Sequence, residues 1–410
     1  MKRTTTAIIG AGQSGLAMSH ELTLAGVDHV ILERGQIANS WRKERWDSLR
    51  LLTPNWMNGL HGHDYKGTDH DGYMHVAELI NAFDASAAKS GAPVRAETTV
   101  LSVDGTPGAY RVQTDQGALS CNSVVMANGA CATPKIPAFA SQLPDQVQSF
   151  TPQTYKRPAQ LPDGKVLVVG ASASGMQLAR EIQQSGRQVV LAVGTHSRFP
   201  RNYRDADITM WLEIIGATTI PYTEVDDIER VRRTPSLTLV ADETIDLNSL
   251  QDLGVEITGR LVAINDGRAL FSGSLANHCA AADLKMNRLL ESIDDWVDAA
   301  DLTNLVAPVQ RYVPTRVPTA PRLSMDLAAE GFGAVLWATG YRPDFNWLEL
   351  PVFDRKGNLK HDGGVVAEGL YAMGLPYLRQ RKSTFIDGAC DDARALAAHL
   401  TAGLARSIAA

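Results

Sequence analysis

Two glycine-rich segments have the residue pattern in this sequence that is best suited to binding chemistry. GAGQSG occupies residues 10–15 after an apolar run at 7–9, and GASASG occupies residues 170–175 after an apolar run at 166–169. In such a turn the first glycine permits a sharp bend, the small third residue lets the backbone approach a ligand, and the last glycine lets helix and strand pack closely. The free N–H groups and the dipole at the helix start attract an anion. Each turn therefore predicts a binding site for the pyrophosphate of a dinucleotide.

The surroundings of the two turns repeat as well. One glycine motif alone is weak evidence for such a site. Here each turn opens an apolar helix that ends at a glycine, Gly26 or Gly186, and a β-branched strand follows each of these glycines. The duplication predicts two dinucleotide sites on a chain of alternating strands and helices.

The residues that end the second strand of each unit predict which dinucleotide binds where. Glu33 ends that strand in the first unit, close to the roughly 20-residue spacing at which a carboxylate accepts hydrogen bonds from ribose hydroxyls. In the second unit no acid stands there, and Arg198, Arg201 and Arg204 follow. Guanidinium groups match a 2′-phosphate, although a solvated basic turn is an equally good interpretation for Arg204. The sequence therefore predicts FAD at the first turn and NADPH at the second.

Composition is that of a globular enzyme. The 410 residues predict about two domains, and 44% hydrophobic with 20% charged residues is ordinary for a folded protein. The net charge of −6, without any Lys/Arg run, gives no sign of a nucleic acid or an anionic membrane as partner. The sequence enters its first strand within a few residues and has no apolar run near the roughly 20 residues of a membrane helix. We therefore expect a cytoplasmic protein without a membrane span.

Neither the cysteines nor the histidines predict a metal or a dithiol. The four cysteines, at 121, 131, 279 and 390, lie far apart and form no C-x-x-C pair, which argues against disulfides, a zinc ribbon and a redox dithiol. His61 and His63 lie in a polar loop with His70 and His75, and loop histidines are more often solvated than metal-bound. We expect no metal site.

The positions of the two units predict the domain organisation. The FAD-binding domain comprises residues 1–155 and, because the tail has no glycine turn of its own, also residues 321–410. The NADPH-binding domain comprises residues 156–320. Elements are expected at 75–90 (helix), 98–103, 110–114 and 123–129 (strands), 283–299 (helix) and 334–340 (strand), with a tryptophan-rich insertion at 40–73. The predicted fold is α/β with two Rossmann-like domains, the NADPH domain being inserted in the FAD domain.

Several longer motifs resemble those of one family. They are WR at 41–42, RWDSLRL at 45–51, HSRFPRNYR at 196–204, ATGYRPD at 338–344 and RKSTFIDG at 381–388. With the glycine turns they resemble the flavin-containing monooxygenases, and most closely the bacterial FAD-dependent oxidoreductase members. The resemblance implies that NADPH reduces FAD and that the reduced flavin reacts with O2. A C4a-(hydro)peroxyflavin then transfers one oxygen atom to a small organic molecule at nitrogen, sulfur or a ketone.

The chain departs from this family at the linker into the second domain. The family motif places Phe, Gly and His before an aromatic residue, and here those positions hold Asp145, Val147 and Thr151, with only Tyr155 retained. Many members also place an Asn near the flavin ring where this chain has Leu52. The chain is therefore either a divergent monooxygenase or a reductase or oxidase that inserts no oxygen. A flavoprotein without enzymatic activity is the third class.

The cofactor supplies the reactive chemistry, so no catalytic side chain is assigned. Trp41, Trp46, Trp56 and Tyr73 line a flavin-side cavity or, alternatively, form core beneath the insertion. The resemblance favours contact with the cofactor for Trp41 and Arg50, and for Asp344 and Asp387. We expect FAD to contact Gly10, Gly12, Gln13, Ser14, Gly15, Glu33, Arg34, Trp41, Arg50, Thr53, Val100, Ala127, Gly129, Asp344 and Asp387. We expect NADPH to contact Gly170, Ser172, Ser174, Gly175, Thr195, Arg198, Arg201, Ala338, Thr339 and Gly340.

Overall fold

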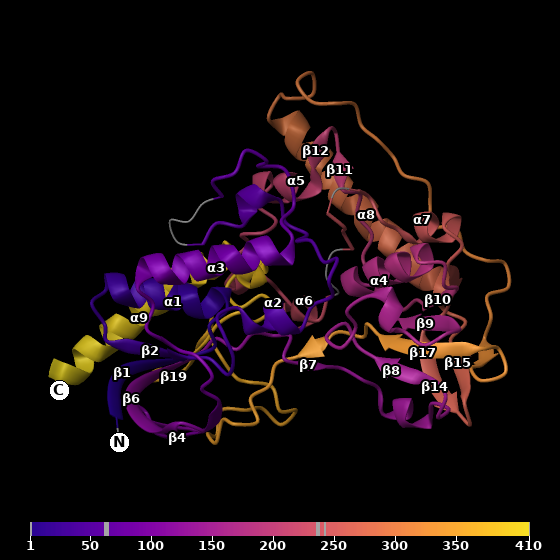
Figure 1. Ribbon diagram of the computed structural model, residues 1–410. Helices are drawn as coiled ribbons and strands as arrows, with labels where there is room; N and C mark the ends of the chain where they lie inside the picture. The colour runs from indigo at the N-terminus through magenta and orange to yellow at the C-terminus, as the bar shows by residue number, and fades with distance from the viewer. Residues whose placement is uncertain (1, 61–64, 235–237, 242, 410) are drawn as a thin grey trace.

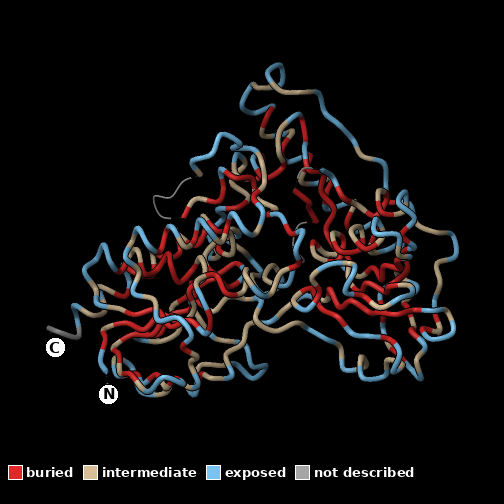
Figure 2. The backbone as a smooth tube through the Cα atoms, viewed as in Figure 1, coloured by how far each residue is buried: buried red, intermediate tan, exposed pale blue. Residues whose placement is uncertain are grey.

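The computed structural model describes residues 2–60, 65–234, 238–241 and 243–409. They form two lobes, each built on its own sheet (Figure 1). Buried residues are concentrated in the helices and strands of both lobes, whereas many residues of the connecting loops are exposed (Figure 2). The predicted α/β fold is confirmed.

The first lobe contains an eight-stranded sheet with the order β19-β20-β6-β1-β2-β3 and with β4 and β5 attached to β6. β1 lies between β2 and β6 and pairs with both in parallel, so its last residues are buried on both faces and are apolar. The strands of this sheet are β1 (Lys2–Ile9), β2 (His29–Leu32), β3 (Val94–Arg95), β4 (Val100–Thr106), β5 (Ala109–Thr114), β6 (Gly117–Met126), β19 (Val365–Ala367) and β20 (Leu370–Ala372).

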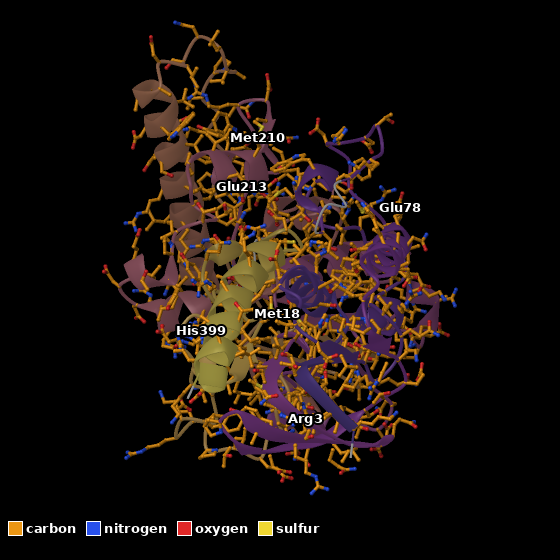
Figure 3. The ribbon with its side chains drawn as sticks, turned by 90° about the vertical axis from the view of Figure 1, so that its left-hand side faces the viewer. Arg3, Met18, Glu78, Met210, Glu213 and His399 are labelled. Atoms are coloured by element: carbon orange, nitrogen blue, oxygen red, sulfur yellow. The ribbon has the colours of Figure 1, made fainter. Side chains whose placement is uncertain are left out.

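Three helices pack together on this sheet. They are α1 (Gln13–Leu24), α3 (Val76–Ser90) and α9 (Gly388–Ala409). Seen from the side, α9 crosses in front with His399 at its surface, and Met18 of α1 lies in the core behind it (Figure 3). The C-terminal helix therefore completes the core of the domain that the N-terminus begins.

The second lobe contains a parallel five-stranded sheet with the order β13-β10-β9-β17-β8 and a small antiparallel sheet, β14-β15-β16. The strands are β8 (Gln148–Phe150), β9 (Lys165–Val169), β10 (Val189–Ala192), β13 (Glu256–Thr258), β14 (Leu261–Asn265), β15 (Arg268–Phe271), β16 (Ser324–Asp326) and β17 (Phe332–Trp337). The helices are α4 (Ala173–Gln184), α7 (Leu247–Asp252) and α8 (Leu275–Ala299). The second sheet thus begins before residue 156 and continues beyond residue 320, so this unit is longer at both ends than the sequence predicts.

α8 begins at Leu275, earlier than the expected start at residue 283. Its two halves pack in different cores. Leu275 and Cys279 belong to the core around the parallel sheet, whereas Leu290 and Val297 pack with Trp211 in a separate cluster at the tip of the lobe. The acidic face that signals a helix from residue 283 onward is missing from its first two turns.

The remaining elements are short and lie in the connections and at the junction of the lobes. β7 and β18 pair antiparallel where the chain passes between the lobes (Figure 1). These elements are α2 (Asn39–Lys43), α5 (Ile208–Ile214), α6 (Ile228–Arg232), β7 (Thr133–Pro134), β11 (Asn202–Tyr203), β12 (Ala206–Asp207), β18 (Tyr341–Arg342), and the 3₁₀ turns η1 (Asn55–Met57), η2 (Ala138–Gln142), η3 (Pro158–Gln160), η4 (Tyr222–Glu224) and η5 (Arg381–Thr384).

Candidate dinucleotide sites

The first glycine turn is shaped by close backbone contacts. Gly10 has a φ of +106°, and a methyl group on it would lie 2.6 Å from the carbonyl oxygen of Ala127 at the end of β6. A methyl group on Gly15 would lie 1.9 Å from the carbonyl oxygen of Gly10. These two glycines therefore serve the packing of β1, β6 and α1, and neither tolerates a side chain.

Gly12 is different, because its side-chain position faces open space. A methyl group there would meet nothing within 4 Å. Gly12 is also the N-cap of α1, which receives no side-chain capping hydrogen bond and has no acidic residue in its first turn. The first N–H groups of α1 are thus available to an anion.

Glu33 closes this turn from the end of β2. Its carboxylate is buried and accepts hydrogen bonds from the backbone N–H of Ala11 at 2.8 Å and of Gly35 at 3.1 Å. These two hydrogen bonds hold the carboxylate beside the turn. Each of its two oxygens keeps a lone pair that can accept a hydrogen bond from a ribose hydroxyl.

A cavity of about 330 Å³ opens in front of this turn, at the carboxyl ends of β1, β2 and β6. Its wall includes eleven of the residues expected from the sequence to contact FAD. They are Gly10, Gly12, Gln13, Ser14, Glu33, Arg34, Trp41, Val100, Ala127, Gly129 and Asp344. The carboxyl ends of parallel strands are where α/β folds bind ligands, so the position of the cavity fits a dinucleotide.

Several wall residues were not expected from the sequence. They include Asn39, Arg45, Thr98, Asn128, Cys131, Trp347, Gly374 and Thr384. The carbonyl oxygen of Asp344 organises two of them, because it accepts hydrogen bonds from the Asn128 side chain at 2.8 Å and from the Trp347 indole at 3.1 Å. Asn128 and Cys131 follow the buried strand β6, so the rule that ligands bind at carboxyl strand ends offered a signal for them.

Four residues expected to contact FAD stand outside the cavity wall. Gly15 serves packing, as described above, and Thr53 donates a hydrogen bond to Asn58 at 2.6 Å. Arg50 is exposed and lines a separate groove against α4. Asp387 forms an ion pair with Lys382 at 3.5 Å, and burial raises the pKa of its carboxyl group.

The aromatic residues of the insertion divide between cavity and core. Trp41 lines the cavity, with the Arg45 guanidinium 5.0 Å above its ring. Trp46 packs in the core of the second lobe, and Trp56 is 39% exposed. The insertion thus provides one cavity wall and also a docking surface for the second lobe.

The second glycine turn repeats the geometry of the first. Gly170 has a φ of +109°, and a methyl group on it would lie 2.4 Å from the carbonyl oxygen of Ala338, at the end of β17. A methyl group on Gly175 would lie 1.8 Å from the Gly170 carbonyl oxygen. Ser172 is the N-cap of α4 and makes no side-chain capping bond, so this helix start is also available to an anion. Ser172 and Ser174 are half-buried at the turn.

Thr339 and Gly340 continue from Ala338 beside this turn. They tie the end of β17 to the linker, since the Thr339 hydroxyl donates to the Lys135 carbonyl and the Lys135 N–H donates to the Gly340 carbonyl at 2.9 Å. Thr195, which follows β10, is exposed at the same edge of the sheet.

The arginines expected to hold a 2′-phosphate are bound elsewhere. The Arg198 guanidinium donates to Asp246 and Asp283, both at 2.7 Å, and only 6% of its side chain is exposed. Arg201 is 1% exposed and pairs with Asp207. Asp246 and Asp283 are distant from Arg198 in sequence, and Asp207 lies beyond the run of arginines. The sequence motif therefore could not predict these pairings.

Arg201 belongs to a contact between the lobes, together with Tyr73 and Asp207. The Tyr73 hydroxyl donates to Asp207 at 2.6 Å, and the Arg201 guanidinium lies 4.5 Å from the Tyr73 ring centroid and donates to the Leu52 carbonyl at 2.8 Å. Burial and the hydrogen bond to Asp207 raise the pKa of Tyr73, so its hydroxyl stays protonated.

A second contact between the lobes centres on Glu181 of α4. Its carboxylate accepts hydrogen bonds from the Ser48 hydroxyl and, at 2.9 Å, from the Tyr155 hydroxyl. The insertion of the first lobe is thus fixed to the second lobe at two polar points, at Ser48 and at Tyr73, both of which follow Trp46 in sequence.

Comparison with known proteins identifies the family. The profile of the pyridine nucleotide-disulphide oxidoreductases matches residues 7–237. An uncharacterized CzcO-like oxidoreductase of Geobacillus kaustophilus is 30% identical over 95% of this chain and 96% of its own length. The chain belongs to this family. It is a flavin-dependent oxidoreductase, as the sequence predicts.

Solved structures of this family's fold match the whole chain. A flavin-containing monooxygenase from Stenotrophomonas maltophilia has a TM-score of 0.67 and 18% identity, with 98% of this chain and 99% of that chain covered. A bacillithiol disulfide reductase from Staphylococcus aureus has a TM-score of 0.61 and 13% identity over 98% of this chain. At these identities the likeness shows the fold, which is the expected one with two dinucleotide-binding units.

Among the described residues no group of His, Cys, Asp and Glu could hold a metal ion, while His61 and His63 lie outside the described residues. No helix in the described part of the chain is long and apolar enough to cross a membrane.

Proposed function

We propose that this oxidoreductase uses NADPH to reduce bound FAD and uses O2 to oxygenate a small organic molecule at nitrogen, sulfur or a ketone. The observation that supports it is the pairing of a cavity at the first glycine turn with a second turn of the same geometry. One turn suits the flavin dinucleotide and the other suits the nicotinamide dinucleotide. We further expect the protein in the cytoplasm.

The residues of the first turn fit the pyrophosphate and ribose of FAD. Gly12 leaves space for the pyrophosphate, the start of α1 offers free N–H groups, and Glu33 is held where it accepts from a ribose hydroxyl. When bound, the flavin would supply electron transfer and the reaction with oxygen. The chain's own contribution would be to hold the cofactor against the cavity wall, which includes Trp41 and Trp347, and to exclude water from it.

Relatives with oxygenating activities support an oxygenase. A rice indole-3-pyruvate monooxygenase is 31% identical over 45% of this chain, and an S-allyl-L-cysteine S-oxygenase from Allium sativum has the same fold with a TM-score of 0.59. Their substrates are small molecules oxidised at different atoms, so the proposal keeps the class of substrate open between nitrogen, sulfur and ketone.

A reductase or oxidase that inserts no oxygen is the alternative, and the linker residues favour it. Asp145 is exposed, Val147 packs in the core of the second lobe, and Thr151 closes a turn in which its N–H donates to the Thr154 hydroxyl at 2.9 Å. None of the three stands in the described cavity wall. The residues that occupy the family's motif positions therefore serve the fold of the linker.

The balance of NADPH, O2, peroxide and product distinguishes the two functions. We expect the FAD-loaded protein to consume one O2 per NADPH and to release an oxygenated product with a thioether, a tertiary amine or a ketone. Without such a substrate, because Thr151 and Leu52 replace family residues, we expect nearly stoichiometric hydrogen peroxide. Peroxide as the sole product with all three substrate classes would support the alternative. Failure to oxidise NADPH at all would contradict both.

A further inference from the structure

A 2′-phosphate would lie at one edge of the second sheet. The arginines that follow β10 are not free to bind it there. Arg198 and Arg201 are buried and paired with carboxylates. Arg204 is 3% exposed and donates to Asp294 at 3.1 Å and to the Ala307 carbonyl at 2.9 Å. A phosphate could reach these guanidinium groups only by displacing their carboxylates, which would leave buried charges unpaired.

Arg260 is an arginine of a different kind at this edge. It follows β13, whose residue Thr258 accepts a hydrogen bond from the N–H of Val193 at 3.0 Å, so the ends of β10 and β13 lie side by side. The Arg260 stem packs over Gly194: a methyl group on Gly194 would lie 3.7 Å from its Cγ and 3.8 Å from its Cδ. The Arg260 side chain is exposed, and no carboxylate of the described residues pairs with it.

The described neighbours of Arg260 at this edge include hydroxyl side chains. Thr195 is exposed beside Gly194. On the other side the N–H of Ser272 donates to the Arg260 carbonyl at 2.9 Å, and the hydroxyls of Ser272 and Ser274 lie 2.8 Å apart. Ser274 is the N-cap of α8, whose first turn contains no acidic residue. A dianionic group would thus meet a cation, hydroxyls and a helix start here.

The distance from the second glycine turn suits the ribose of an adenosine. Val169, Ala192 and Thr258 stand in register across β9, β10 and β13. With neighbouring strands about 4.8 Å apart, Arg260 lies on the order of 10 Å from the Gly170 turn. The ribose that carries the 2′-phosphate is joined directly to the pyrophosphate, so a pyrophosphate at Gly170 places this ribose over the end of β10, next to Arg260.

We infer that Arg260 recognises the 2′-phosphate of NADPH and thereby sets the coenzyme preference of this oxidoreductase. The inference rests on the proposed function, in which a nicotinamide dinucleotide binds the second turn. Arg260 would take the role expected of Arg198 and Arg201. It follows the neighbouring strand β13, and its stem packs over Gly194.

Calorimetric titration of the FAD-loaded protein with NADP⁺ and with NAD⁺ tests this assignment without turnover. A hydrogen-bonded ion pair to the 2′-phosphate predicts that the wild type binds NADP⁺ about 10- to 100-fold more tightly than NAD⁺. Arg260→Ala should bring the ratio of the two dissociation constants close to one by weakening NADP⁺ binding alone. Arg288→Ala, which removes an exposed arginine of α8 in the same lobe, is the matched control and should leave the ratio unchanged.

Gly194→Asp provides a test in the opposite direction. Gly194 has no positive φ and its side-chain position makes only ordinary contacts, so the variant should fold. Its carboxylate would pair with Arg260 and repel a 2′-phosphate, which should reverse the preference towards NAD⁺, whereas Gly194→Ala should retain NADP⁺.

An unchanged ratio in Arg260→Ala, or equal weakening of both dinucleotides, would overturn the assignment. Because the readout is binding, a failure to oxygenate substrate would not affect it.

Discussion

Two glycines of the first turn lack a side chain for opposite reasons. A methyl group on Gly15 would clash with the Gly10 carbonyl oxygen at 1.9 Å, whereas one on Gly12 would meet no protein atom within 4 Å. We therefore expect Gly12→Val to fold but to lose FAD, because its side chain would occupy the position of the pyrophosphate. Gly15→Val should instead destabilise the protein itself, since backbone must move to admit the side chain.

Loss of FAD binding and loss of stability are distinguished by measuring flavin content and melting temperature. Flavin absorbance per protein should be near zero for Gly12→Val after reconstitution with FAD, while its apo form should melt within a few degrees of the wild-type apo form. Gly15→Val should melt far lower or remain insoluble. Full flavin content in Gly12→Val would show that the cofactor does not approach this turn.

Single residues also show how far sequence reasoning reaches at this scale. The positions of Gly10, Gly12 and Glu33 at the cavity were predictable because they depend on local backbone and on a fixed spacing along one strand, helix and strand unit. Arg198 was expected to bind a phosphate because no acid ends the strand before it. Its partners Asp246 and Asp283 come from segments far along the chain, so the sequence pattern did not show that it is paired. Whether an arginine is free or paired depends on tertiary contacts, and no local pattern encodes it.

At the scale of the element, α9 contains a buried carboxylate near its start. Asp392 is 1% exposed, and burial raises its pKa to about 7 against the opposing effects of Ser383, Arg379 and Lys382. Between about pH 4 and pH 7 the folded protein therefore binds one more proton at this site than the unfolded chain does. Stability contributed by the neutral carboxyl group is lost as the pH rises through this range.

Asp392→Asn should remove this dependence, because an amide needs no proton to stay neutral. At 1.36 kcal/mol for each pKa unit, the variant should gain at most about 4 kcal/mol of unfolding free energy relative to wild type at pH 8, and little at pH 4. Urea unfolding of both proteins at the two pH values measures the difference. Asp145→Asn, which changes an exposed carboxylate far from this helix in sequence, is the control and should show no such trend. An equal effect of Asp392→Asn at both pH values would contradict the assignment.

Elements with a strong local pattern were predicted well, and those defined by their neighbours were not. The helix expected at 75–90 is α3 (Val76–Ser90), because its apolar spacing and its end at Gly91 are local signals. β8 (Gln148–Phe150) has no apolar run of its own and is a strand only because β17 lies beside it. This is why the second unit extends beyond its expected start.

At the scale of the molecule, the two candidate dinucleotide sites lie in different lobes, so any electron transfer between them would depend on how the lobes are held together. Asp207 connects three parts of that junction: it accepts from Arg201, from the Tyr73 hydroxyl of the first lobe, and from the N–H of Thr209 at the start of α5. The sequence showed the insertion and the two units but not this junction, since its residues come from separate segments.

Tyr73→Phe tests what the junction does. It removes the hydrogen bond to Asp207 but leaves the ring beneath Arg201, and a bond to a charged group contributes about 1.5–3 kcal/mol. We expect unchanged FAD content and NADP⁺ affinity, because neither site is touched, but slower reduction of the flavin by NADPH in an anaerobic stopped-flow experiment.

Tyr110→Phe, which loses a hydrogen bond to the Glu368 carbonyl within the first lobe, is the control. Its flavin should be reduced by NADPH at the wild-type rate. If both variants match the wild type, the junction supports the fold and does not set the distance between the dinucleotides. If Tyr73→Phe alone is slow, the lobes must be docked through Asp207 before the nicotinamide can reach the flavin.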